Sequence, residues 1–380
     1  MSETVFKNAR IVLADEIVSG CVAVTDGLIT SVDSGGTAVP GAKDIEGDYL
    51  VPGLIELHTD HLESHFRPRP GVMWNPIAAV QSHDMQVAGS GITTVLDALR
   101  AGTDADARAL AEQMRTLADA IQEAGSDGRL RADHYVHLRC EIASPDVIGE
   151  AEAMLDHPIL KLVSVMDHTP GQRQFVSLDK FREYYLGKSL MTPDELERYI
   201  AERHALHLEH AAPNRTALFE LCRTSQIVVA SHDDATEDHV AEAAAEGVVL
   251  SEFPTTMEAA RAAKDADMAV LMGAPNVVRG GSHSGNVSAT ELAAEGLLDV
   301  LSSDYVPFSL LHAVFLLPER IDAISLPEAI RMVTANPARA IDFDDRGAIE
   351  PGLRADLVRV HFADGVPVVR GVWRNGKRVA

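Results

Sequence analysis

Apolar runs alternate with segments of helical periodicity through the middle of the chain. Eight apolar runs predict strands, at residues 49–58, 91–98, 134–142, 160–166, 227–231, 247–251, 269–272 and 298–302. Between the second and third runs, one face of a predicted helix carries Leu110, Met114, Leu117 and Ile121. A longer helical insertion is predicted over about 179–223, with a helix start at Thr192-Pro193. Strand–helix alternation is typical of a parallel barrel or a doubly wound sheet, and a closed (β/α)8 TIM-like barrel needs eight strands.

The two ends of the chain are β-rich instead. Short strands are predicted at 5–12, 21–24 and 28–30, and again at 355–360, 367–369 and 371–374. Asp26-Gly27 and Asn375-Gly376 are hairpin-turn pairs. We therefore expect a small composite β-domain from both termini, residues 1–50 and 345–380, beside a barrel domain of residues 51–344.

Composition and charge exclude several classes of protein. The 380 residues include 33 Lys+Arg and 57 Asp+Glu, a formal net charge of −24, which disfavours a nucleic-acid binder or a protein of anionic membrane surfaces. No apolar run approaches the roughly 20 residues that span a bilayer, and the first residues lack the pattern of a secretory signal. Three widely spaced cysteines, Cys21, Cys140 and Cys222, form no disulfide framework, so we expect a cytoplasmic protein.

Histidine and carboxylate side chains gather where the predicted strands end. Five of the eight strands end this way, and the residues concerned are His58 and Asp60, Glu141, His168, His232 and Asp304. Any single one could merely cap a helix. Together they favour a metal site, because imidazole nitrogen and carboxylate oxygen bind zinc-like ions and the carboxyl ends of barrel strands form the catalytic face.

Three loops carry arginine in settings that suit an anion. They are Arg67-Pro68-Arg69-Pro70-Gly71, Gly171-Gln172-Arg173-Gln174, and residues 278–286, which contain Arg279, Gly280-Gly281 and His283. The last resembles a nest of backbone N–H groups and does not match the P-loop pattern. Each loop could also be an ordinary turn with a solvated arginine, but barrels often bind phosphate after strands seven and eight.

Several motifs resemble known proteins over essentially the whole chain. Residues 51–60, Asn336-Pro337-Ala338 and residues 352–357 resemble the amidohydrolase superfamily. The more specific motifs are His58-Thr59-Asp60, Ser82-His83-Asp84 and residues 67–70, 91–95, 167–175, 230–236, 273–276 and 279–286. With these the chain is similar to the PhnM family of the carbon–phosphorus lyase pathway.

This resemblance implies a distorted (β/α)8 barrel and a diphosphatase that hydrolyses α-D-ribose 1-methylphosphonate 5-triphosphate to the 5-phosphate and pyrophosphate. It implies one or two divalent ions, with Zn²⁺ expected and Mn²⁺ or Fe²⁺ as alternatives. We expect the ligands among His58, Asp60, Glu141, His168 and His232, with Asp304 as general base. We expect Arg69, Arg173, Arg279 and His283 to bind the phosphate and phosphonate groups.

One position departs from the wider superfamily, whose usual His-X-His is His58-Thr59-Asp60 here. His61 follows at once, where Asn is common in the PhnM family. Strand alternation points His61 away from the face of His58 and Asp60, so we do not expect it to bind the same metal.

Two other functions stay open from the sequence. Hydrolysis of a C–N bond in a cyclic amide or an aminated heterocycle uses the same metal chemistry but needs no cluster of arginines. A non-enzymatic barrel kept for assembly would be expected to lose metal ligands. The expected partners are a small phosphorylated substrate and a second copy of the chain in a homodimer, with neither nucleic acid nor membrane.

Overall fold

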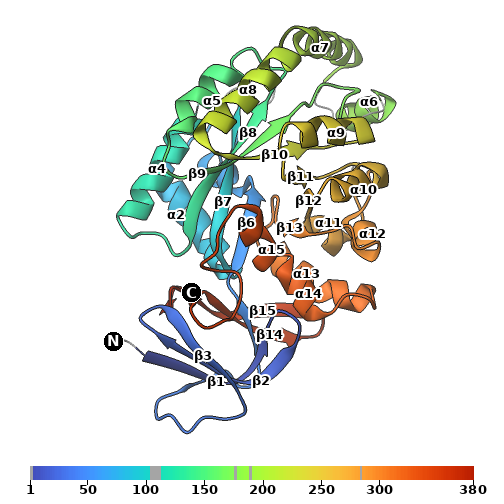
Figure 1. Ribbon diagram of the computed structural model, residues 1–380. Coiled ribbons are helices and arrows are strands. Elements are labelled where there is room, and N and C mark those ends of the chain that lie inside the picture. The colour runs from blue at the N-terminus through green and yellow to red at the C-terminus, as the bar shows by residue number, and fades with distance from the viewer. Residues whose placement is uncertain (1–2, 103–112, 175–177, 188–190, 283–284) are drawn as a thin grey trace. The chain divides into compact units, whose positions relative to one another are not determined.

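The computed structural model describes residues 3–102, 113–174, 178–187, 191–282 and 285–380 (Figure 1). The chain divides into two compact units. The first comprises Met1–Asp97, Ala120–Tyr135 and Met272–Ala380, and the second comprises Ala98–Asp119 and Val136–Leu271. Within the described residues, none of the helices combines the length and the apolar character that crossing a bilayer would need.

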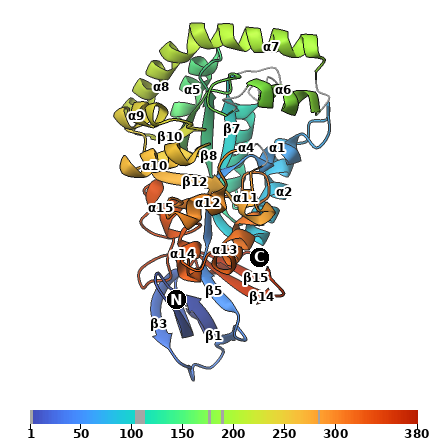
Figure 2. The same cartoon turned by 90° about the vertical axis from the view of Figure 1, so that its right-hand side faces the viewer.

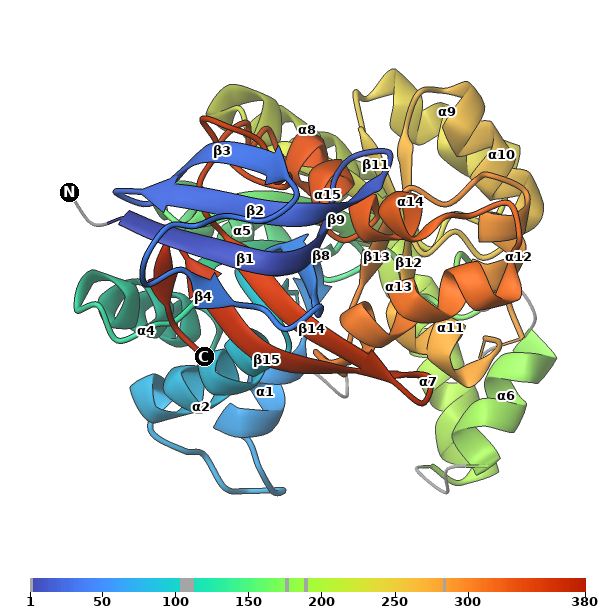
Figure 3. The same ribbon diagram turned by 90° about the horizontal axis from the view of Figure 1, so that it is seen from below.

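Both ends of the chain build one sheet of the first unit, as predicted. Its order is β16-β15-β14-β5-β1-β2-β3, with β4 paired to β1. Figure 3 shows β1, β2, β3 and β4 of this sheet together with β14 and β15. Its strands are β1 (Glu3–Val12), β2 (Ile17–Thr25), β3 (Leu28–Ser34), β4 (Lys43–Asp44), β5 (Tyr49–Pro52), β14 (Leu357–Ala363), β15 (Val366–Arg374) and β16 (Lys377–Arg378). A buried core that includes Phe6, Ile11 and Trp373 joins the two ends, and the Phe6 and Trp373 rings meet edge to face with centroids 4.9 Å apart.

The predicted strand at 49–58 is in fact two strands in different sheets. β5 belongs to the terminal sheet, and β6 (Leu54–Thr59) begins the second sheet. Gly53 separates them, and its N–H donates to the Asp356 carbonyl at 2.7 Å. A Cβ at Gly53 would lie 2.2 Å from Thr93 Oγ1 and 2.9 Å from Asp356 Cβ, so only glycine fits this passage between sheets.

The second sheet has eight strands in chain order, from β6 to β13. After β6 come β7 (Ile92–Ala101), β8 (Asp133–Glu141), β9 (Leu160–Met166), β10 (Val228–His232), β11 (Leu250–Glu252), β12 (Ala269–Gly273) and β13 (Val300–Ser302). The β6–β7, β8–β9, β9–β10, β10–β11 and β11–β12 pairs are parallel. A parallel bridge from Thr59 to Asp304 links the end of β6 to the residues after β13. This connectivity is that of a (β/α)8 barrel, and all eight predicted barrel strands are present.

Helices follow most of these strands. The first unit contains α1 (His61–Phe66), α2 (Pro76–Gly89), α11 (Ala274–Arg279), α12 (Ala289–Ala294), α13 (Ser309–Arg320), α14 (Leu326–Arg331) and α15 (Ala335–Ala340). Within it, α11 packs against α12 and α13 (Figure 2). The second unit contains α5 (Val147–Leu155), α6 (Leu178–Gly187), α7 (Pro193–Leu206), the π-helical η1 (His207–Ala211), α8 (Ala212–Ser225), α9 (Glu237–Ala245) and α10 (Met257–Asp265).

Two helical predictions are confirmed. Helix α4 (Met114–Ser126) buries Met114, Leu117 and Ile121, whereas Leu110 lies outside the described residues. The predicted insertion corresponds to α6, α7, η1 and α8. α7 starts with a capping box at Thr192, whose side chain accepts from the Glu195 N–H while Glu195 accepts from the Thr192 N–H.

Candidate active site

The structure brings three predicted site residues of the first unit together at the end of β6. The Asp304 N–H donates to the His58 carbonyl at 3.1 Å, and the Asp60 N–H donates to the Asp304 carbonyl at 3.1 Å. The Thr59 hydroxyl donates to the same Asp304 carbonyl at 2.9 Å. The backbone of the proposed general base is therefore fixed to the two proposed ligands, His58 and Asp60.

Glu56 strengthens this arrangement, and the sequence-based prediction missed it. One carboxyl oxygen accepts from the His58 N–H at 2.7 Å and the other from the Ser303 N–H at 2.6 Å. Burial raises the pKa of Glu56 to about 8, although these hydrogen bonds oppose the shift. The signal was present in the sequence, because Glu56 stands two residues before His58 and strand alternation puts both on one face.

In the second unit, Glu141 at the end of β8 holds His168 after β9. Glu141 Oε2 lies 2.8 Å from His168 Nδ1, and the His168 N–H donates to Oε1 at 3.2 Å. Because the carboxylate accepts a hydrogen bond from the Nδ1–H group, the lone pair that could bind a metal is on Nε2.

Two arginines complete the surroundings of Glu141. Arg100 donates to Oε2 at 3.2 Å and Arg203 to Oε1 at 3.1 Å. Burial alone would raise the pKa of Glu141, but its hydrogen bond with His168 and the charges of Arg100 and Arg203 outweigh burial and lower it. Glu141 is therefore an ionised, buried carboxylate.

His168, His232 and Asp233 form a group whose ligand atoms all lie within 4.8 Å of one another. His232 Nδ1 is 3.1 Å from Asp233 Oδ2, and His168 Nε2 is 3.7 Å from the same oxygen. Burial would raise the pKa of Asp233, but its hydrogen bond with His232 opposes burial and the pKa is lowered. Two imidazoles and a carboxylate are a donor set that suits a divalent ion such as Zn²⁺. The predicted ligand set did not include Asp233.

The residues that follow β10 and β13 have an unusual backbone conformation. Asp233 follows β10 with φ +58°, and Asp304 follows β13 with φ +55°. Non-glycine residues in the left-handed region are uncommon, and residues held there cluster at functional sites.

The three predicted anion-binding arginines have different surroundings. Arg69 and Arg279 are exposed, whereas Arg173 is buried. The Arg173 guanidinium donates to Asp234 and, at 3.1 Å, to Glu242. These contacts anchor the loop after β10 to Arg173, and a role for Arg173 in binding substrate stays a prediction.

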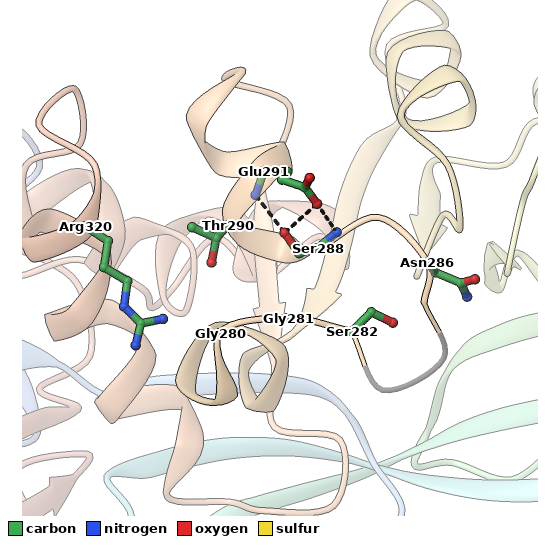
Figure 4. Close-up of a pocket in the computed structure, with 8 residues that line it drawn as sticks. All are labelled: Gly280, Gly281, Ser282, Asn286, Ser288, Thr290, Glu291 and Arg320. Atoms are coloured by element: carbon green, nitrogen blue, oxygen red, sulfur yellow. Dashed lines mark hydrogen bonds between the residues drawn. The ribbon is translucent and has the colours of Figure 1, made fainter.

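The glycine-rich loop after α11 borders a cavity of about 560 Å³, which Gly280, Gly281, Ser282, Asn286, Ser288, Thr290, Glu291 and Arg320 line (Figure 4). The N–H groups of Gly280 and Gly281 both donate to the Asn276 carbonyl, at 3.1 and 3.0 Å. The nest interpretation is therefore wrong for these two groups, because they terminate α11. His283 lies outside the described residues.

Comparisons with known proteins agree with this architecture. Residues 190–379 match the amidohydrolase family. The chain is 48% identical over 376 residues to the alpha-D-ribose 1-methylphosphonate 5-triphosphate diphosphatase of Escherichia coli (strain K12). The alignment covers 99% of this chain and 100% of that protein. It is 25% identical over 392 residues to an imidazolonepropionase of Deinococcus deserti, covering 94% of this chain and 91% of that protein.

Among solved structures, N-acetylglucosamine-6-phosphate deacetylase from Pasteurella multocida aligns with a TM-score of 0.65 at 15% identity over 99% of both chains, a likeness of fold alone. The connectivity, the donor groups at the strand ends and the full-length similarity lead to one assignment. The chain belongs to the amidohydrolase family and, within it, to the PhnM family that includes the Escherichia coli diphosphatase.

Proposed function

We propose that the protein hydrolyses α-D-ribose 1-methylphosphonate 5-triphosphate to the 5-phosphate and pyrophosphate in phosphonate catabolism. The observation that carries the proposal is the 48% identity to the Escherichia coli diphosphatase over 99% of the chain. The reaction breaks the anhydride linkage between the α- and β-phosphoryl groups and adds water across it.

The donor groups support a bound divalent ion, for which we propose Zn²⁺. His168 and His232 would hold it with the carboxylate of Asp233, whose ligand atoms lie within 4.8 Å of theirs. His58 and Asp60, at the end of β6, stay proposed ligands on the sequence pattern alone. Such an ion supplies Lewis acidity and lowers the pKa of water bound to it toward about 7.

The chain's own residues do the remaining work. Asp304 would accept the proton of the attacking water, and its backbone contacts with His58 and Asp60 fix its position. Glu141 was predicted from the sequence as a metal ligand, but its carboxylate is paired with His168, Arg100 and Arg203, and we propose instead that it orients His168 through Nδ1. The exposed guanidinium groups of Arg69 and Arg279, with His283, would bind the polyphosphate and the phosphonate.

We also propose that the protein acts as a homodimer in the cytoplasm. Cys21, Cys140 and Cys222 are buried free thiols, which supports a reducing compartment.

The proposal is tested by measuring pyrophosphate release from a panel of 5-triphosphates, including the ribose methylphosphonate and ordinary nucleoside triphosphates, together with the metal content of each preparation. We expect release from the ribose methylphosphonate triphosphate in proportion to bound metal. Similarity to an imidazolonepropionase favours a second candidate, hydrolysis of a C–N bond in a small heterocycle. Turnover of a cyclic amide with no pyrophosphate release would replace the first function by the second.

A further inference from the structure

Three histidines that the hydrolytic site does not use lie together in the first unit. His61 and His65 stand four residues apart on α1, and His83 is on α2. Residues at this spacing share one face of a helix, and α1 packs against α2. One nitrogen of each ring belongs to a group of atoms within 4.8 Å of one another.

We propose that His61, His65 and His83 bind a divalent transition-metal ion of their own, with Zn²⁺ as the ion that the ligand set favours. Three imidazoles with one open position are a recurrent zinc arrangement. This site is separate from the ligand set that we propose for hydrolysis, and it does not depend on the proposed function.

The distance between two of the rings fits a shared ion. His61 Nδ1 lies 3.3 Å from His83 Nδ1. Two nitrogens at the usual Zn–N distance of about 2.0–2.1 Å in tetrahedral geometry are separated by about 3.3–3.4 Å.

A buried carboxylate fixes which nitrogen of His83 is available. Asp97 Oδ1 lies 2.7 Å from His83 Nε2, and both side chains are completely buried. Nε2 therefore carries the proton, and the lone pair is on Nδ1, the atom that faces His61. A carboxylate on the far nitrogen of a histidine ligand is the usual second partner in zinc sites.

Asp97 is itself held in place. Its other oxygen lies 2.7 Å from His134 Nδ1, and His134 Nε2 is 3.4 Å from Asp84 Oδ1. The orientation of His83 is thus set by a buried series of paired groups before any ion arrives.

The third ring supplies an atom that needs a partner. His65 Nε2 is buried, and within the described part of the chain it makes no hydrogen bond. A buried polar nitrogen without a partner is costly, and such atoms are rare in folded proteins. A metal ion bound to Nε2 would satisfy this nitrogen.

An ion at this position would act on the catalytic end of β6. Helix α1 has six residues, begins directly after Asp60, and has no side-chain cap at Asp60. Such a short helix is not stable by itself. Joining its two histidines to α2 would hold the turn that carries Asp60.

The test counts metal in the full-length protein, independently of turnover. Variants are made in a His168→Asn/His232→Asn background, which removes proposed ligands of the hydrolytic ion. Each protein is titrated with Co²⁺, and binding is followed by the visible absorption of the bound ion. A second sample is loaded with Zn²⁺ and dialysed, and its metal content gives the number of equivalents bound.

We expect the background protein to retain one bound equivalent. His61→Asn or His65→Asn should weaken Co²⁺ binding by at least about tenfold, since even a partner that only orients a ligand contributes that much. His312→Asn, at a partly buried histidine on α13, is the matched control and should bind as the background does. Circular dichroism checks the fold, and His83 is left intact because it is buried.

Unchanged Co²⁺ affinity in the folded His61→Asn and His65→Asn variants would overturn the proposal, as would a background protein that binds no ion. Absence of pyrophosphate release from the wild-type protein, with this metal count as expected, would bear on the proposed function alone.

Discussion

The rings of His168 and His232 have centroids 5.6 Å apart and share Asp233 as a neighbour. We predict that His168→Ala and His232→Ala each lower bound metal and pyrophosphate release together, because each removes a proposed ligand. His204→Ala is the control, because the His204 ring makes a hydrogen bond to the Pro170 carbonyl at 2.6 Å and is not a proposed ligand. This variant should keep its bound metal and its pyrophosphate release. Full metal content with normal turnover in either test variant would contradict the assignment.

Asp304→Asn should separate catalysis from metal binding. Asparagine tolerates the left-handed φ of +55° found at this position, so the backbone contacts with His58 and Asp60 should persist. We predict nearly unchanged metal content and a fall in rate on the order of 10²-fold or more, as expected when a general base is lost.

Asp342→Asn is the control for Asp304→Asn, because Asp342 is exposed and has a similar φ of +57°. It should turn over at the wild-type rate. An unchanged rate in Asp304→Asn would assign the general base to another residue.

His134 predicts a pH dependence of stability. Burial would lower its pKa, but Asp97 and Asp84 outweigh burial and raise it to about 9. A raised histidine pKa adds stability that is complete below the unfolded value of 6.5 and is lost as the pH rises through about 9. His134→Gln should therefore lower the unfolding free energy most at pH 6.5, on the order of 3 kcal/mol, and less at pH 10.

Urea unfolding of the wild type and His134→Gln at pH 6.5, 8 and 10, with a chelator present, measures this difference. A cost that does not change with pH would show that His134 acts through packing and not through its charge.

At the scale of single elements, the capping box of α7 gives the sharpest expectation. Thr192→Ala removes the side chain that accepts from the Glu195 N–H, and we predict a loss of about 1 kcal/mol in unfolding free energy. Thr192→Ser keeps a hydroxyl and should lose much less. Hydrogen exchange at the start of α7 should rise in the alanine variant, and equal exchange in both variants would contradict the role of the cap.

The presence of most strands and helices could be predicted because apolar runs and turn residues indicate them directly. β9 was predicted at its observed bounds, Leu160–Met166. The error at 49–58 has a physical cause, since one continuous apolar run crosses from one sheet to another at Gly53. The run itself contains no sign of Thr93 and Asp356, the distant residues that make glycine necessary.

In the candidate site too, some residues could be predicted from the sequence and others could not. His58, Asp60 and Glu141 could be predicted as candidates because the ends of barrel strands form the catalytic face. Arg203, which binds the Glu141 carboxylate from 62 positions along the chain, has no local signal. The nest interpretation failed at Gly280 and Gly281 because glycine after a helix serves the C-cap as readily as it serves an anion.

For the whole molecule, the net charge of −24 opposes the approach of a triphosphate. If the proposed function holds, capture would depend on short-range contacts with the proposed arginines and metal. Repulsion between separated charges is screened over a Debye length of about 8 Å at physiological salt, whereas contacts inside a site are screened much less. We predict that moderate added salt leaves kcat/KM unchanged or raises it slightly. A steep fall with salt in the wild type would instead indicate positive steering of the substrate.

Arg279→Ala tests the short-range part of the same argument. Arg279 is exposed in the last turn of α11, beside the glycine-rich loop. Its loss should cost about 1.5–3 kcal/mol in substrate or transition-state binding, which is typical of a charged hydrogen bond. Arg129→Ala removes the same charge from an exposed arginine paired to Asp127, so it controls for the whole-molecule field and should leave kcat/KM nearly unchanged. The measurement is kcat/KM for the three proteins from low to moderate ionic strength. An equal effect of both substitutions would mean that Arg279 acts only through net charge, and no effect of either would assign the anion site to other residues.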